Sequence, residues 1–158
     1  TGKTYRYCIS RAPILNPFDA GLAWHRPLAW SVDILEQAVH LFRGTHDFTA
    51  FAALRGNEPR PIPEGHFRRT ITQTQVAQTG EHVFITFTGT GFLYKMVRLM
   101  TGAAHEAARG KITLEELARL INAPLPDDKS PFCAPPDGLT LMRVHYPEET
   151  FGDKKKIN

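Results

Sequence analysis

Four segments of the chain alternate apolar and polar residues with a period of two. They cover residues 4–10, 69–77, 82–88 and 139–146. Such alternation is typical of strands that bury one face. The second and third segments are separated only by residues 78–81, which include Gly80, so the pattern predicts a β-hairpin there.

Three other segments space their apolar residues three and four apart, as one face of a helix requires. The first follows Ser31, a good N-cap, and ends by Gly44. The second runs from about Phe92 to Arg109. The third begins at Thr113, where Thr and Glu stand at capping-box spacing.

The order of these elements is strand, helix, hairpin, helix, helix, strand. It predicts an α+β fold with a largely antiparallel β-sheet and helices packed on one face. We expect one domain over residues 1–150 and a disordered basic tail over 151–158. The proline-containing stretch 11–30 is expected to be an irregular loop that Trp24 and Trp30 anchor to the core.

Composition narrows the class of protein. The net charge of +3 and a pI near 9.0 favour an acidic partner such as nucleic acid. No apolar run is long enough for a membrane span, so we expect a cytoplasmic protein with no membrane partner. Cys8 and Cys133 have no neighbours at metal-ligand spacing, so we expect both to be reduced thiols. Because the chain begins with Thr1 shortly before a strand, we also expect a piece of a longer protein.

The segment 92–109 has two different sides. Lys95, Arg98, Gly102, His105 and Arg109 lie opposite its apolar residues. Periodicity alone favours a solvated basic face. The alternative is that Lys95 and Arg98 project into a cleft that holds an anion.

Other candidate motifs are weak. The turn 89–91 lacks the third glycine and the lysine of a nucleotide-binding loop. His46 and Asp47 are adjacent, which suits local capping better than acid–base chemistry. The sequence indicates no catalytic triad, metal site or organic cofactor.

Five blocks in one order resemble the tRNA pseudouridine synthase family of the TruA type. They are specific as a set and span nearly the whole chain. The blocks are Thr4-Tyr5-Arg6-Tyr7, Gly44-Thr45-His46-Asp47-Phe48-Thr49-Ala50-Phe51, Arg69-Thr70-Ile71, Gly91-Phe92-Leu93-Tyr94-Lys95-Met96-Val97-Arg98, and Ala134-Pro135-Pro136-Asp137-Gly138-Leu139.

The resemblance implies half of a pseudouridine synthase fold and the isomerisation of uridine to pseudouridine in the tRNA anticodon stem-loop, at positions 38 to 40, without metal or organic cofactor. In this family the catalytic aspartate lies in a Gly-Arg-Thr-Asp-Ala-Gly motif of the N-terminal half, which this chain does not contain. The chain is therefore expected to be inactive alone and to need that N-terminal half. The resemblance also implies a homodimer.

It further implies roles for seven residues. Two would be catalytic: Tyr5 would stack on the target base and help with proton transfer, and Arg98 would pair with the catalytic aspartate. The others would bind substrate: Leu93 and Val97 as an apolar wall one turn apart on a helix, and Lys95, Arg68 and Arg69 as phosphate contacts. Each residue also has an ordinary structural interpretation. Tyr5 could be a strand aromatic, Leu93 and Val97 core residues, and the basic residues solvated cations.

A stand-alone, non-catalytic RNA-binding module is the interpretation that competes with an enzyme fragment. A structural or dimerisation domain is a third interpretation, based on the apolar helices and compatible with the enzyme fragment. The segment 57–63 departs from the family pattern, which weakens any tRNA contact predicted there. The enzymatic hypothesis requires Tyr5 and Arg98 to meet in one concavity.

Overall fold

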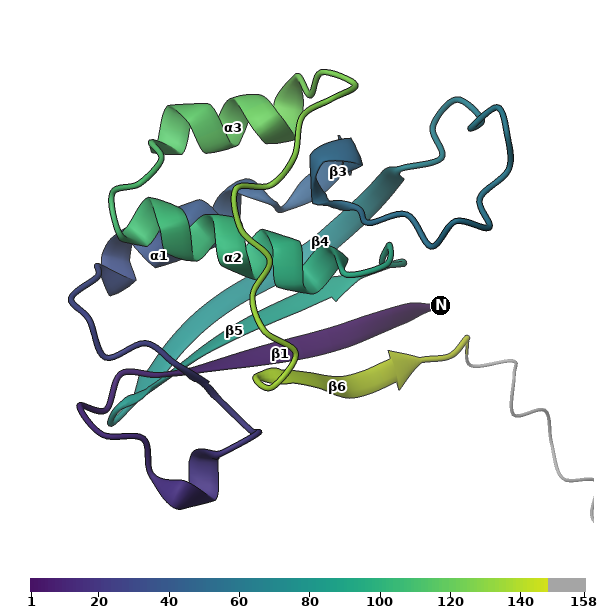
Figure 1. Cartoon of the computed structure of the whole chain (residues 1–158). Coiled ribbons are helices and arrows are strands. Elements are labelled where there is room, and N and C mark those ends of the chain that lie inside the picture. Colours follow the sequence, from purple (N-terminus) through teal and green to yellow (C-terminus); the bar gives the residue numbers. More distant parts are fainter. Residues whose placement is uncertain (148–158) are drawn as a thin grey trace, which may run out of the picture.

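The computed structural model describes residues 1–147, so the predicted tail, residues 151–158, lies outside the described part (Figure 1). None of the helices within residues 1–147 has the length and apolarity needed to cross a bilayer. The elements are β1 (Gly2–Ser10), η1 (Pro17–Asp19), β2 (Trp24–His25), α1 (Val32–Leu41), β3 (Gly44–Asp47), η2 (Thr49–Phe51), β4 (Arg68–Thr79), β5 (His82–Gly89), α2 (Met96–Ala108), α3 (Leu114–Asn122) and β6 (Leu139–His145).

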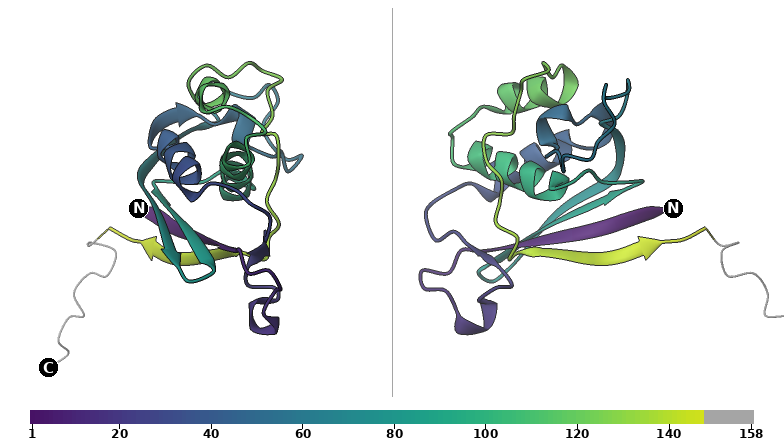
Figure 2. Two further views of the ribbon diagram at one scale, coloured as in Figure 1. Left: turned by 90° about the vertical axis from the view of Figure 1, so that its left-hand side faces the viewer. Right: turned by 45° about the vertical axis from the view of Figure 1, so that its right-hand side comes forward.

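The strands form one mostly antiparallel sheet in the order β2-β1-β5-β4-β3, and β6 also pairs with β1. Only β2 runs parallel to its partner. Helices α1, α2 and α3 lie on one side of this sheet (Figures 1 and 2). The predicted α+β class with helices on one face is confirmed.

The predicted hairpin is present but tighter than expected. Thr79 pairs with His82, so the turn consists of Gly80 and Glu81 instead of four residues. Gly80 has φ +56°, a conformation that glycine adopts without steric cost.

The core lies between the sheet and the helices. Tyr7 and Ile9 of β1 and Ile85 of β5 are fully buried, as their alternation predicts, and they pack with Leu35 of α1 and Met100 of α2 in one cluster. The apolar periodicity therefore identified the buried faces of both element types.

The local signals also located most helix starts. Ser31 accepts a hydrogen bond from the Ile34 amide at 3.2 Å, and Thr113 accepts one from the Glu116 amide at 3.1 Å. The loop 11–30 is anchored by buried Trp24 and Trp30, as expected. The short strands β2 and β3 were not predicted, because such short segments show no period of their own.

The second helix begins later than predicted. It starts at Met96, not at Phe92, because Lys95 has the left-handed φ of 58° and cannot continue a right-handed helix. Residues 92–95 instead precede α2 and include a turn at residues 94 and 95.

The solvated basic face predicted for this helix is wrong at two of its positions, Gly102 and His105, which are buried. The segment 130–134, which we call the strap, crosses α2 and covers it (Figure 1). Its Ala134 amide donates to the Arg98 carbonyl at 3.0 Å, and the Ser130 hydroxyl donates to the Leu99 carbonyl at 3.0 Å. A carbonyl of the strap also lies so close to Gly102 that a methyl group there would clash with Phe132.

We predict that Gly102→Ala destabilises the chain by about 1–3 kcal/mol, because the methyl group must displace the backbone of the strap. Urea unfolding followed by circular dichroism would measure this change. Gly91→Ala is the matched control: its added carbon would meet only the Arg69 side chain at an ordinary 3.7 Å, so we expect a change within about 0.5 kcal/mol. Equal stabilities of the two variants would contradict a close strap.

His105 occupies an unusual place for a histidine. It is fully buried against Trp24 and Trp30, with ring centroids 4.6 and 5.2 Å away, and neither ring nitrogen has a hydrogen-bond partner among residues 1–147. Burial, reinforced by the positive charges of Arg26 and Arg109, lowers its pKa to about 3. The imidazole is therefore neutral in the folded chain at neutral pH.

We predict that His105 makes folding pH-dependent in acid. The unfolded histidine gains a proton as pH falls through 6.5, whereas the folded one resists protonation until about pH 3, so the free energy of unfolding decreases across this window. Between these two pKa values, His105 alone changes the free energy of unfolding by about 1.4 kcal/mol per pH unit at most.

Unfolding titrations of the chain and of His105→Leu at several pH values would measure the difference. The leucine variant should lose this part of the acid dependence. His40→Gln removes an exposed histidine and should leave the slope nearly unchanged. Parallel pH curves for the parent and His105→Leu would refute the assignment.

Candidate functional site

A concavity of about 320 Å³ lies where β1, the 92–95 turn, the start of α2 and the segment before β6 meet. We call it the arginine pocket. Its lining residues are Lys3, Tyr5, Arg55, Phe92, Leu93, Tyr94, Lys95, Met96, Val97, Arg98, Pro136 and Leu139. The structure thus brings Tyr5 and Arg98 into one concavity.

Tyr5 reaches the pocket from β1. It lies on the same face as buried Tyr7, but nearer the end of the strand, and is half-buried. Its ring meets Phe92 edge to face, with centroids 5.0 Å apart. Its hydroxyl makes no hydrogen bond within residues 1–147, and the residue lines the pocket.

Arg98 reaches the pocket from the first turn of α2. Its Nε donates to the Ala134 carbonyl at 2.7 Å, which fixes the plane of the guanidinium. Its two terminal nitrogens make no hydrogen bond or ion pair within the described part of the chain. The strap therefore holds Arg98 in place and leaves its charged end free.

The arginine pocket is strongly positive. Lys3, Arg55, Lys95 and Arg98 line it, and none of its lining residues is acidic. The Arg55 guanidinium and the Lys95 ammonium both lie over the Tyr94 ring, 4.7 and 5.4 Å from its centroid. The pocket can hold a planar ring near Tyr5 and an anion near its cations.

Leu93 and Val97 both line the pocket, but they do not lie on one helix as predicted. Val97 belongs to α2 and is nearly buried, whereas Leu93 precedes the helix. The left-handed Lys95 between them causes this break. The two side chains still form one apolar wall because the turn folds back against the helix start.

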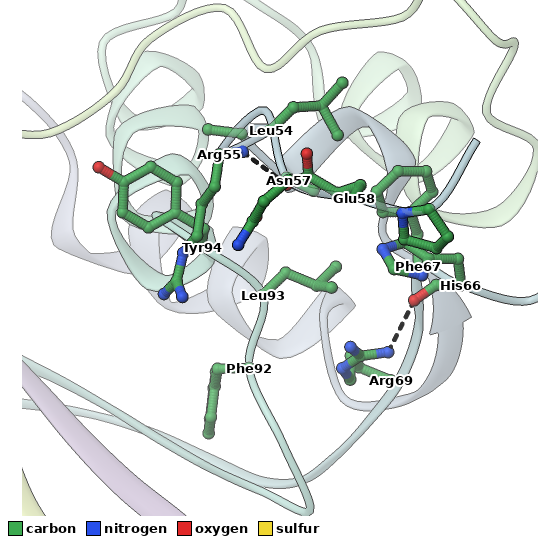
Figure 3. A pocket seen from close by; sticks show the side chains of 13 residues that line it. Leu54, Arg55, Asn57, Glu58, His66, Phe67, Arg69, Phe92, Leu93 and Tyr94 are labelled. Carbon is green, nitrogen blue, oxygen red and sulfur yellow. Dashed lines mark hydrogen bonds between the residues drawn. The ribbon is translucent and has the colours of Figure 1, made fainter. Parts of the chain in front are cut away.

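The structure separates Arg68 and Arg69 from the arginine pocket. Arg69 lines a second concavity of about 300 Å³, which we call the loop pocket (Figure 3). Arg68 is exposed on β4 opposite Asp47. The residues around the loop pocket are Ala52, Ala53, Leu54, Arg55, Asn57, Glu58, Pro59, His66, Phe67, Arg69, Phe92, Leu93 and Tyr94.

Sequence reasoning missed Arg55, Phe92 and Tyr94 as site residues, although the last two stand in a matching block. Arg55 carries no periodic signal, because it lies in the loop after η2. A backbone hydrogen bond of 3.1 Å from the Ala53 amide to the Tyr94 carbonyl brings that loop to the pocket. This bond and the contact of the Arg55 guanidinium with the Tyr94 ring, both non-local, place Arg55 at the pocket.

The capping interpretation of Asp47 is confirmed. Its Oδ1 accepts from the Thr49 amide at 2.9 Å and from the Thr49 hydroxyl at 2.6 Å, and the His46 ring contacts the Arg43 carbonyl at 3.0 Å. Asp47 thus orders the entry to η2 and His46 contacts the chain after α1, and neither residue lines the arginine pocket.

Both cysteines are free thiols, as expected. Burial, together with the negative charge of Asp19, raises the pKa of Cys8 to about 11, so this thiol is a poor nucleophile at neutral pH. Neither cysteine lines the arginine pocket.

Comparison with known proteins gives a consistent result. Residues 38–147 match a family described as tRNA pseudouridine synthase. The chain is 99% identical over all 158 residues to a tRNA pseudouridine synthase A of Akkermansia muciniphila, of which it covers 60%. It is 35% identical over 147 residues (93% of the chain, 55% of the relative) to that of Methylacidiphilum infernorum, and 34% identical over 146 residues (92% and 56%) to that of Listeria innocua. The chain thus spans little more than half the length of these relatives.

Proposed function

The chain belongs to the tRNA pseudouridine synthase family, and we propose that it is the C-terminal part of an enzyme that isomerises uridine to pseudouridine in the tRNA anticodon stem-loop. The observation that carries the proposal is that Tyr5 and Arg98 share a pocket with four cations and no acid in its lining. Such a pocket is suited to a carboxylate supplied from outside the chain.

The carboxylate is the aspartate that the family resemblance assigns to the N-terminal half. Paired with Arg98, it would stay ionised and oriented, because a nearby guanidinium lowers the pKa of a carboxyl group. The strap contributes by fixing Nε of Arg98 on the Ala134 carbonyl, which leaves the two terminal nitrogens for the carboxylate.

Tyr5 is the proposed stacking partner of the target base. The edge contact with Phe92 fixes its ring, and base–aromatic stacking contributes about 1–3 kcal/mol. Leu93 and Val97 form the apolar wall that keeps water from the glycosidic bond. Lys95 is a proposed phosphate contact at the rim; Arg68 and Arg69 have the same role farther out along the RNA.

The reaction requires the uridine to leave the helix stack, at a cost of a few kcal/mol. The bond from C1′ of the ribose to N1 of the base breaks, the base turns, and C1′ joins C5. N1 gains a proton and C5 loses one, so atoms balance without a cofactor. Release of the C5 hydrogen provides a direct assay.

The partners follow from this assignment. The enzyme would act in the cytoplasm on tRNA, with the N-terminal half completing the cleft and a second copy forming a homodimer. Four large apolar side chains of the 11–30 loop support an interface on this part of the chain, since they are 63–87% exposed: Ile14, Phe18, Leu22 and Leu28.

We predict that the 158-residue chain alone releases no tritium from C5-labelled tRNA, because its pocket has no carboxylate. Addition of an N-terminal half, fused or in trans, should restore release. Turnover by the isolated chain would refute the need for an external aspartate. Binding of RNA by the chain alone, with no turnover even after the N-terminal half is added, would instead favour a stand-alone, non-catalytic RNA-binding module.

We further predict that Arg98→Gln in the longer enzyme lowers kcat by roughly 100-fold or more, since breaking a buried ion pair costs about 3–5 kcal/mol. The acid limb of the kcat profile should also move to higher pH, because a carboxyl group without its arginine has a higher pKa. Steady-state tritium release at several pH values would measure both effects.

Lys111→Gln, which removes an exposed cation outside both pockets, is the control and should change kcat less than about twofold. Arg98→Lys should recover the position of the acid limb better than the rate, because lysine keeps the charge but not the planar fork. An unshifted pH profile in Arg98→Gln would show that Arg98 does not pair with the essential carboxylate.

A further inference from the structure

The loop pocket adjoins the arginine pocket. Both pockets are lined by Arg55, Phe92, Leu93 and Tyr94, so residues 92–94 form the wall that separates them. The volume of the loop pocket, about 300 Å³, is at the lower end of the range of ~300–1,000 Å³ for pockets that hold small molecules. A ligand that crosses the wall would occupy both concavities.

Arg55 stands at this wall with its charge available. Its guanidinium lies over the Tyr94 ring, and it has no ion pair within residues 1–147 (Figure 3). The loop that carries it is tied by Glu58, whose carboxylate accepts from the amides of Arg55 and Gly56 at 2.5 and 2.8 Å. Those hydrogen bonds engage the one acidic group of the pocket and lower its pKa.

Arg69 lies on the other side of the same pocket (Figure 3). Its Nη1 donates to the carbonyls of His66 and Arg68 at 3.0 and 2.7 Å. These contacts fix the guanidinium, while Nε and Nη2 make no hydrogen bond within the described chain. The loop pocket therefore has two cations on opposite sides: Arg55, which packs on the Tyr94 ring, and Arg69, which backbone carbonyls hold in place.

We propose that the loop pocket binds the nucleotide that adjoins the target uridine in the RNA strand. The proposal rests on the function proposed above and adds a second subsite to it. The base of this nucleotide stacks on the Arg55 guanidinium, which Tyr94 backs, and its phosphate contacts Arg69.

Three features favour a nucleotide. The two cations exceed the single carboxylate, so the pocket attracts an anion even with His66 neutral. A guanidinium plane stacks on any base, as single-stranded RNA recognition requires. The shared wall places the subsite directly beside the proposed uridine site, as consecutive nucleotides of one strand demand.

The test uses the full-length enzyme and anticodon stem-loop RNAs in which the nucleotide on one side or the other of the target uridine is abasic. For the wild-type enzyme, one of the two abasic RNAs should raise KM by roughly 5- to 100-fold, in line with the loss of one stacked base. The kcat should change little, because the target uridine itself is intact.

In Arg55→Gln the intact RNA should already show the raised KM, and the abasic RNA should add less than a twofold change. Arg43→Gln removes an exposed arginine outside both pockets and should keep the full abasic effect. The inference is overturned if the abasic RNAs bind as well as intact RNA, or if Arg55→Gln keeps the wild-type response to them. A wild-type enzyme that releases no tritium from any of these RNAs would overturn the proposed function itself.

Discussion

The contact between the strap and α2 is the constraint on which the site depends. Backbone and side chain of Arg98 both bond to Ala134, one accepting and one donating, so the residue is fixed at both ends of its stem. The close approach requires a glycine at position 102, where any side chain would meet the backbone of Phe132. The strap covers this side of α2 and therefore holds Arg98 at the edge of the arginine pocket, with its two terminal nitrogens unbonded within the described chain.

The second constraint is electrostatic. Four cations line the arginine pocket without an acid among its lining residues, and mutual repulsion makes such a cluster unfavourable until an anion enters. Tyr94 reduces that cost, because its ring faces accept both Arg55 and Lys95. In the proposed function this cluster binds two kinds of anion, a carboxylate beside Arg98 and phosphates at the rim.

Sequence periodicity predicted much of the fold and less of the site. It located the buried faces of β1 and β5 and the caps at Ser31 and Thr113, because these depend on neighbours along the chain. It placed the start of α2 too early, since no local signal marks the left-handed Lys95. The resemblance to a known family selected Tyr5 and Arg98, which periodicity alone could not distinguish from an ordinary strand aromatic and a solvated cation.

By itself the sequence determined the α+β class, the family and the basic character of the chain. These properties depend on strand alternation, helix spacing and ordered motifs, which are patterns in the order of the residues. The tertiary structure decided which cations face a pocket and which face solvent. Arg55 reaches the site through the hydrogen bond between residues 53 and 94 and its contact with the Tyr94 ring, and His105 is buried against the Trp24 and Trp30 rings. Contacts between residues far apart in the chain have no period, so they become visible only when the chain is folded.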